Sequence, residues 1–153
     1  MKTINTYINE KLRLTNKRTY TCHPKDWDEL REIILQRIEN EGNDCDLNDI
    51  DTSKITDMKY LFDIRDNEIF EDFNGDISMW DVSNVNNMHG MFYHCKNFNC
   101  DLSMWNVSNV MDMHCMFFGC EKFNQNLNDW NVSNVKDMLY AFEGCPTQPT
   151  WYK

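Results

Sequence analysis

The chain has 153 residues, of which 41% are hydrophobic, so it is long enough to bury a core and too apolar to be wholly disordered. Its formal net charge of −10 is uneven, because residues 44–145 carry 18 acidic and 6 basic side chains whereas residues 1–43 carry 7 and 8. An acidic body repels nucleic-acid phosphates and favours basic partners, so direct nucleic-acid binding is not expected. No segment approaches the roughly 20 apolar residues of a membrane span, and no signal peptide is recognisable at the start. We therefore expect a cytoplasmic protein without membrane contact; a leader outside this sequence would instead place it at the cell surface or outside the cell.

Residues 1–45 are predicted to form a helical N-terminal cap. Apolar residues recur at helical spacing near the start, and a second helix is expected after Pro24, with Asp26 at its first turn and Gly42 at its end. The apolar positions are Ile4, Tyr7, Ile8 and Leu12 in the first segment, and Trp27, Leu30, Ile33, Ile34 and Ile38 in the second.

Residues 46–145 consist of four repeat units. Three regular units of 25 residues begin at Phe73, Phe98 and Phe123, and a degenerate unit precedes them at an offset of 30 residues. The extra residues lie within the charged segment 63–72, which is expected to be a surface loop. Units of this kind bury their apolar faces by stacking on one another.

Each unit combines two periodicities. Trp80 and Val82 alternate with polar neighbours, which predicts a short strand, and Met88, Phe92 and Cys95 have the spacing of one helical face. We therefore predict an α/β repeat solenoid of the leucine-rich-repeat type, a right-handed coil with short parallel strands and short helices.

The consensus sequence of the unit resembles that of the BspA-like leucine-rich-repeat family; it is F-N-x-D-[IL]-S-x-W-[DN]-V-S-N-V-x-x-M-x-x-M-F-x-x-C. That family occurs in bacterial surface proteins, in mycoplasma lipoproteins and in small proteins of gut bacteria and their phages. The resemblance covers about residues 46–145 and implies parallel strands on one face and a role in adhesion or another interaction. The chain departs from the family in lacking an export signal and lipobox and in having four units rather than a long array.

The outward strand positions form the candidate binding face. They are predicted to make a ladder of carboxylates and short polar groups with two adaptable methionines, suited to a partner protein with a basic patch. An ordinary solvated face is the alternative interpretation. The candidate residues are Asp49, Asp51, Met79, Asp81, Met104, Asn106, Asp129 and Asn131.

Other repeated residues are expected to be structural. The Trp row is predicted to be core, and two Asn rows are predicted to bond turns from coil to coil. Cys95, Cys120 and Cys145 are read as small buried hydrophobes in a reducing compartment, since seven cysteines make a poor disulfide framework. The rows are Trp80, Trp105 and Trp130; Asn84, Asn109 and Asn134; and Asn74, Asn99 and Asn124.

The sequence offers little support for metal, cofactor or catalysis. His89 and His114 share one repeat position near Cys95 and Cys115, but the last unit has no His there and no paired ligand motif occurs. A G-x-S-x-G motif and a Gly-rich phosphate loop are also missing from the sequence. We therefore expect no metal, no cofactor and no enzyme activity.

The C-terminal tail, residues 146–153, leaves two arrangements open. Trp151 and Tyr152 fold back over the last coil, or the uncovered edge pairs with a second copy to give a homodimer. The function expected from these features is a non-catalytic protein-interaction module. A specific version is an inhibitor of a host protein, encoded by a phage or mobile element, whose carboxylates imitate phosphates. A surface adhesion module and a small enzyme are the alternatives.

Overall fold

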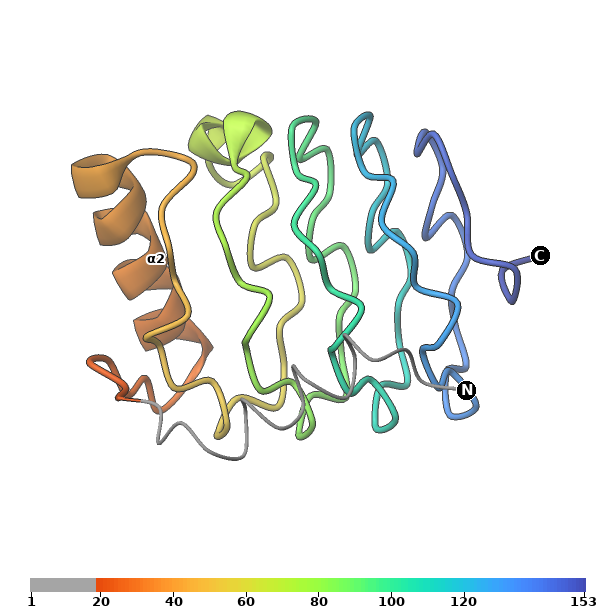
Figure 1. Cartoon of the computed structure of the whole chain (residues 1–153), viewed down its shortest axis with the longest axis horizontal. Helices are drawn as coiled ribbons and strands as arrows, with labels where there is room; N and C mark the ends of the chain where they lie inside the picture. Colours follow the sequence, from red (N-terminus) through yellow and green to blue (C-terminus); the bar gives the residue numbers. More distant parts are fainter. Residues whose placement is uncertain (1–18) are drawn as a thin grey trace, which may run out of the picture.

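The computed structural model of the chain describes residues 19–153, so the helix expected around residues 4–12 lies outside the described residues. Two regular elements occur within the described part. They are the α-helix α2, Trp27–Glu41, and the 3-10 helix η1, Glu68–Asp72. Figure 1 shows α2 beside the first of a series of coils that lie side by side along the molecule, with η1 at one edge.

The helix predicted after Pro24 is confirmed as α2. The Asp26 side chain accepts a hydrogen bond from the Glu29 amide at 3.0 Å, which satisfies one of the free donors of the first turn. At the other end Gly42, at φ 91°, donates its amide to the Ile38 carbonyl. Leu30, Ile34 and Ile38 are buried, so α2 packs its apolar side on the first coil.

The predicted α/β solenoid of the leucine-rich-repeat type, with short parallel strands and short helices, is wrong. Among residues 19–153 no sheet forms, and pairing between successive coils is reduced to isolated parallel bridges. One row of these bridges joins equivalent positions of the four units, Asp57, Asn87, Asp112 and Asp137. The repeat itself therefore builds stacked coils made almost entirely of turns.

The strands fail to form because each coil bends at three corners. At each corner an Asp or Asn side-chain oxygen accepts a hydrogen bond from the backbone amide two residues later, at 2.9–3.2 Å. The three corners of a unit lie five and six residues apart, and the middle one falls within the segment predicted to be a strand, which leaves no straight run for a strand ladder there. The corner residues, unit by unit, are Asp46, Asp51 and Asp57; Asp76, Asp81 and Asn87; Asp101, Asn106 and Asp112; and Asn126, Asn131 and Asp137.

The short helices predicted in each unit are also absent from the described residues. Met91 donates to the carbonyl three residues earlier, Met88, but Met88 and Phe92 donate their own amides to the next coil. A helix would use these amides internally. The spacing of Met88, Phe92 and Cys95 suits both arrangements, because it places the same side chains in the core.

The core consists of side-chain rows that run from coil to coil. Phe62, Phe92, Phe117 and Phe142 stack with 5.3 Å between successive ring centroids. The tryptophans are buried as predicted, and each indole donates to a carbonyl of the preceding coil at 2.9–3.1 Å. The Asn rows are confirmed as well: Asn84, Asn109 and Asn134 donate to preceding Ser carbonyls, and Asn74 and Asn99 accept amides of the next unit.

The tail folds back, which is the first of the two predicted arrangements. The Trp151 indole donates to the Leu127 carbonyl at 2.9 Å, as the repeat tryptophans do one coil earlier. Trp151 and Tyr152 also cover the Phe142 ring edge-on. The tail therefore supplies the indole that a further coil would have supplied.

Candidate functional site

The predicted binding residues lie in turns rather than on strands, but successive units bring them side by side. They occupy the two positions that flank each buried residue of the Trp row, or Ile50 in the first unit, and they lie outside α2 and η1. Coil-to-coil bonds hold the register: the Met79 amide donates to the Asn48 side chain at 2.8 Å. The two rows are Asp49, Met79, Met104 and Asp129, and Asp51, Asp81, Asn106 and Asn131.

Residues of the N-terminal cap contact the two carboxylates of this face in the first unit. Arg37 contacts the Asp49 carboxylate at 3.1 Å, and His23 contacts Asp51 at 3.3 Å. Burial opposes ionisation of Asp49, but hydrogen bonds from Thr21 and Arg37 outweigh it and lower the pKa of that carboxyl. The pKa of Asp51 is lowered chiefly by its hydrogen bond from the Ser53 hydroxyl.

Two acidic members of the face are open to solvent. Asp81 is exposed and bonds locally to the amide and hydroxyl of Ser83, and Asp129 is exposed too. Neither forms an ion pair with a residue in the described part of the chain. Met79 and Met104 are half-buried, so less thioether surface is offered than the sequence suggested.

Much of the acidity lies on the coil corners, of which the sequence analysis named Asp51 and Asp81 but not the other six acidic members. Within residues 46–139 eight corner residues are Asp and four are Asn. Alternation of Asp and Asn at one repeat position was the signal that could have found them, because both supply the same oxygen acceptor. We call these residues the acidic corners: Asp46, Asp51, Asp57, Asp76, Asp81, Asp101, Asp112 and Asp137.

Two histidines lie beside the corner row that contains Asn87, Asp112 and Asp137. The rings of His89 and His114 stack with centroids 4.8 Å apart, and they approach Asp112 and Asp137 at 3.5 and 3.4 Å. The amide of Leu139 and then the His114 ring lower the pKa of Asp137. Among the residues that the structure describes, no group of three or more His, Cys, Asp or Glu is arranged to hold a metal ion. The expectation of a metal-free, cofactor-free protein stays a prediction.

The repeated cysteines pack in or beside the core. Cys95 and Cys120 are buried and donate to the Phe62 and Phe92 carbonyls at 3.0 Å, and burial raises the pKa of both thiols well above its usual value. Cys145 is half-buried, with a pKa raised to about 12 for the same reason. All seven cysteines are free thiols. Neither buried thiol has the low pKa of a nucleophile.

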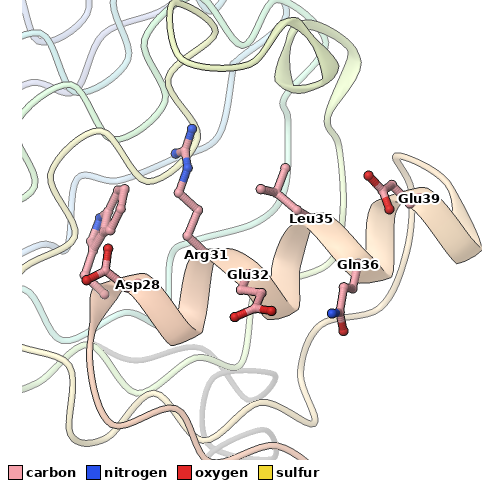
Figure 2. A pocket seen from close by; sticks show the side chains of 7 residues that line it. Asp28, Arg31, Glu32, Leu35, Gln36 and Glu39 are labelled. Atoms are coloured by element: carbon pink, nitrogen blue, oxygen red, sulfur yellow. The ribbon is translucent and has the colours of Figure 1, made fainter.

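A shallow pocket of about 290 Å³ lies along α2. Figure 2 shows Arg31 and Leu35 projecting on one side of the helix, and Glu32 and Gln36 on the other. The charged side chains that line the pocket are three carboxylates and the guanidinium of Arg31, which is hydrogen-bonded to backbone carbonyls of the first coil. The pocket is therefore an acidic groove without a nucleophile–base pair.

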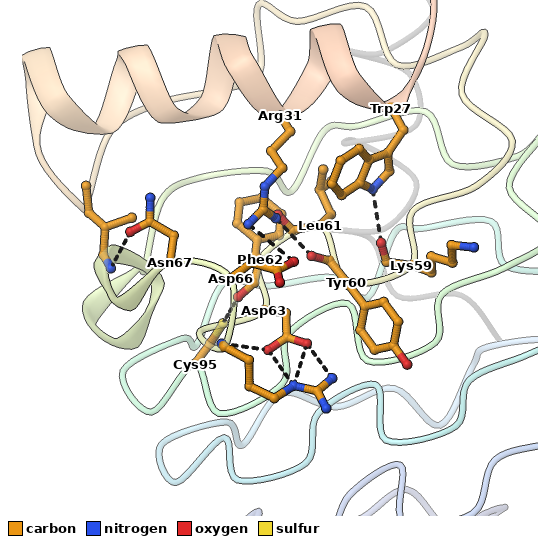
Figure 3. A network of polar contacts seen from close by, with 12 residues as sticks. Trp27, Arg31, Lys59, Tyr60, Leu61, Phe62, Asp63, Asp66, Asn67 and Cys95 are labelled. Atoms are coloured by element: carbon orange, nitrogen blue, oxygen red, sulfur yellow. Dashed lines mark hydrogen bonds and ion pairs between the residues drawn. The ribbon is translucent and has the colours of Figure 1, made fainter.

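Arg31 and Trp27 cover the carbonyl end of the first coil (Figure 3). The Arg31 guanidinium donates to the Tyr60 and Leu61 carbonyls at 2.9 and 2.6 Å, and the Trp27 indole donates to the Lys59 carbonyl at 3.0 Å. Arg31 is 9% exposed, lies over the Phe70 ring and has Asp66 at 3.7 Å. Burial lowers the pKa of the guanidinium, and Asp66 opposes that shift.

These donors replace a missing coil. In the second unit the carbonyls of His89 and Met91 accept amides of Tyr60 and Phe62 from the coil before, at 2.9 Å. The equivalent carbonyls of the first unit, Lys59 and Leu61, have no earlier coil, and side chains of α2 serve them instead. The role of α2 in this contact is structural, because it satisfies buried acceptors.

In the described part of the chain, stacked coils with Asp and Asn at their corners define a repeat protein. A family model described as "Mycoplasma protein of unknown function, DUF285" matches residues 32–150, and the chain belongs to this family. Comparisons with curated proteins and with solved structures found no match. In the described part of the chain, no helix combines the length and apolarity that crossing a membrane requires.

Proposed function

We propose that this chain is a non-catalytic protein-interaction module that binds a basic patch of a partner through its acidic corners. One observation carries the proposal. The fold needs an oxygen acceptor at each corner, and Asn provides it in four of the twelve places, yet Asp stands in the other eight. The negative charge is thus more than the architecture requires, and a field of this sign attracts basic surfaces and speeds their association.

Of what the resemblance to BspA-like proteins implies, only the function enters this proposal. The resemblance favours an interaction role, and membership in a mycoplasma-type family agrees with a bacterial setting. A specific form is an inhibitor of a nucleic-acid-binding host protein, encoded by a phage or mobile element and acting in the cytoplasm, with carboxylates in place of phosphates. Surface adhesion is the second candidate, favoured by the occurrence of BspA-like repeats in surface proteins.

The chain offers a charge-removing variant that keeps the fold. Asp81→Asn, Asp101→Asn and Asp112→Asn each install the residue that another unit already carries at that corner, at Asn106, Asn126 and Asn87. The matched control removes three carboxylates from the groove along α2 instead, by Asp28→Asn, Glu32→Gln and Glu39→Gln. Both triple variants change the net charge equally.

The test is quantitative capture of partners from a lysate of the native host, followed by titration of the captured protein. We expect the corner variant to weaken binding about threefold to a hundredfold, since each exposed charge contributes about 0.2–1 kcal/mol. The groove variant should bind like wild type. Affinity of wild type should fall steeply between low and high salt. Equal capture by the corner variant, or affinity insensitive to salt, would count against the proposal.

A further inference from the structure

Along the segment that follows the last corner of each regular unit, the backbone bonds between coils run in one direction, whereas the amides of Met111 and Lys136, just before it, donate back to the preceding coil. Four alternate amides of the third unit donate to four carbonyls of the fourth, at 2.7–3.0 Å, and the second unit does the same toward the third at 2.7–2.9 Å. No carbonyl in these two sets accepts in the opposite direction. The donors are Met113, Cys115, Phe117 and Gly119, with acceptors Asp137, Leu139, Ala141 and Glu143; and Met88, Gly90, Phe92 and His94, with acceptors Asp112, His114, Met116 and Phe118.

The two ends of such an array differ chemically. The first unit presents carbonyls, and α2 covers these with Trp27 and Arg31. The fourth unit presents amides, at the positions that follow each accepting carbonyl: Met138, Tyr140, Phe142 and Gly144. None of these four amides has a hydrogen-bond acceptor among residues 19–153, since the tail bonds to Leu127 and Asn128 instead. We call these four residues the amide edge.

The side chains at the amide edge are unusually apolar for their position. Leu139 is 55% exposed and Tyr140 49% exposed, and both exceed every other large hydrophobic residue in the described part of the chain. The second unit places His89 and Gly90 there. Tyr140 adopts φ 58°, a left-handed conformation that suits Gly90 better. Among residues 19–153, the edge-on contact of Tyr140 with His114 is the one ring contact that this pair makes.

We propose that the amide edge binds an extended, apolar segment of a partner protein, whose carbonyls continue the array while its side chains pack on Leu139 and Tyr140. The interface is a continuation of the one that joins the coils within the chain, and pairing of a segment with an exposed edge is a recurring mode of peptide recognition. It uses no charge. It is therefore independent of the acidic corners and insensitive to salt.

A second copy of this chain does not fit as the occupant. Its matching carbonyls lie under α2, bonded to Trp27 and Arg31. Two amide edges facing each other present donors alone, so they cannot form backbone hydrogen bonds. A homodimer through this end, one of the two arrangements that the sequence left open, would have to rest on the side chains of Leu139 and Tyr140.

The test uses a displayed library of random 12-residue peptides, selected on the full chain in about 0.5 M salt to suppress binding to the acidic corners. The edge variant Leu139→His with Tyr140→Gly restores the residues of the second unit and relieves the left-handed Tyr, so it should fold at least as well as wild type. The control variant Met111→Asn removes the other exposed large hydrophobic residue and installs the Asn that the second unit carries as Asn86.

We expect the selected peptides to bind wild type and Met111→Asn alike and the edge variant at least about tenfold more weakly. Hydrogen exchange should be fast at the four edge amides in the free protein and slowed about tenfold or more by a bound peptide, while the amides of Met113, Cys115 and Phe117 stay protected throughout. Failure to enrich peptides, equal binding to the edge variant, or edge amides protected without peptide overturns the proposal. Concentration-dependent protection with a dimer in sedimentation would assign the edge to a second copy and overturn it too. Loss of peptide binding in the acidic-corner variant would overturn it as well, because binding at the amide edge uses no charge.

Discussion

The substitution Arg31→Met tests whether α2 stabilises the stack by satisfying the carbonyls of the first coil. Methionine keeps most of the aliphatic length of arginine but donates no hydrogen bonds, so the carbonyls of Tyr60 and Leu61 lose the guanidinium bonds at 2.9 and 2.6 Å. The Tyr60 carbonyl keeps its hydrogen bond from the Asp63 amide at 3.2 Å, so the Leu61 carbonyl is the acceptor left without a donor, which costs about 1–3 kcal/mol. The ion pair with Asp66 adds little, because that carboxylate is largely exposed.

We therefore expect Arg31→Met to lower the free energy of unfolding by about 1–3 kcal/mol, a sizeable part of the ~5–15 kcal/mol typical of a domain. In urea the midpoint should fall by roughly 1 M, given slopes of ~1–3 kcal/mol per M. Arg31→Lys retains the charge and an N–H donor group, so its urea midpoint should lie between those of wild type and Arg31→Met.

The matched control is Lys25→Met, which removes a cation from the exposed i,i+4 pair with Glu29 just outside the stack. It should leave the midpoint unchanged. The reasoning is refuted if Arg31→Met unfolds at the wild-type urea concentration, or if Lys25→Met and Arg31→Met lower the midpoint equally.

Two further predictions concern thiols and acid. Because burial raises the pKa of the Cys95 and Cys120 thiols, both should resist a thiolate-specific reagent at pH 8 in the native protein and react once it is unfolded, and rapid native labelling of either would contradict this. The folded-state pKa of Asp49 is lowered, so its contribution to stability is complete above the unfolded value of about 4 and is lost as pH falls through the folded value. Asp49→Asn should accordingly lose less stability than wild type between about pH 5 and pH 2.5 in urea titrations, and equal losses would show that this carboxyl is not linked to folding.

The candidate site was predictable in part. Outward positions such as Asp81 and Asp129 could be identified from the repeat, since residues that flank a buried Trp are exposed when coils stack. The neutralisation of Asp49 by Arg37 could not, because Arg37 lies on α2 and reaches the face only through tertiary packing. The same holds for the amide edge, because only the folded chain reveals that the amides of Met138 and Tyr140 have no acceptor among the described residues.

The sequence by itself determined the local units of this protein. The 25-residue period set which side chains form core rows, the spacing of the Trp and Asn rows set their coil-to-coil bonds, and Asp26 and Gly42 set the bounds of α2. Such features follow from one residue type at one position, and they hold in either of the architectures that the pattern allows.

Only the tertiary structure decided what the backbone does between those anchors. Apolar spacing at Met88, Phe92 and Cys95 buries the same side chains in a helix or in a chain of turns, so periodicity could not separate the two. The neighbouring coil decides between helix and turns, because its carbonyls at Asp112 and Met116 accept hydrogen bonds from the amides of Met88 and Phe92, which a helix would have bonded internally. The direction of those bonds along this segment leaves one end with carbonyls that Arg31 and Trp27 serve, and the other with amides that have no acceptor in the described part of the chain.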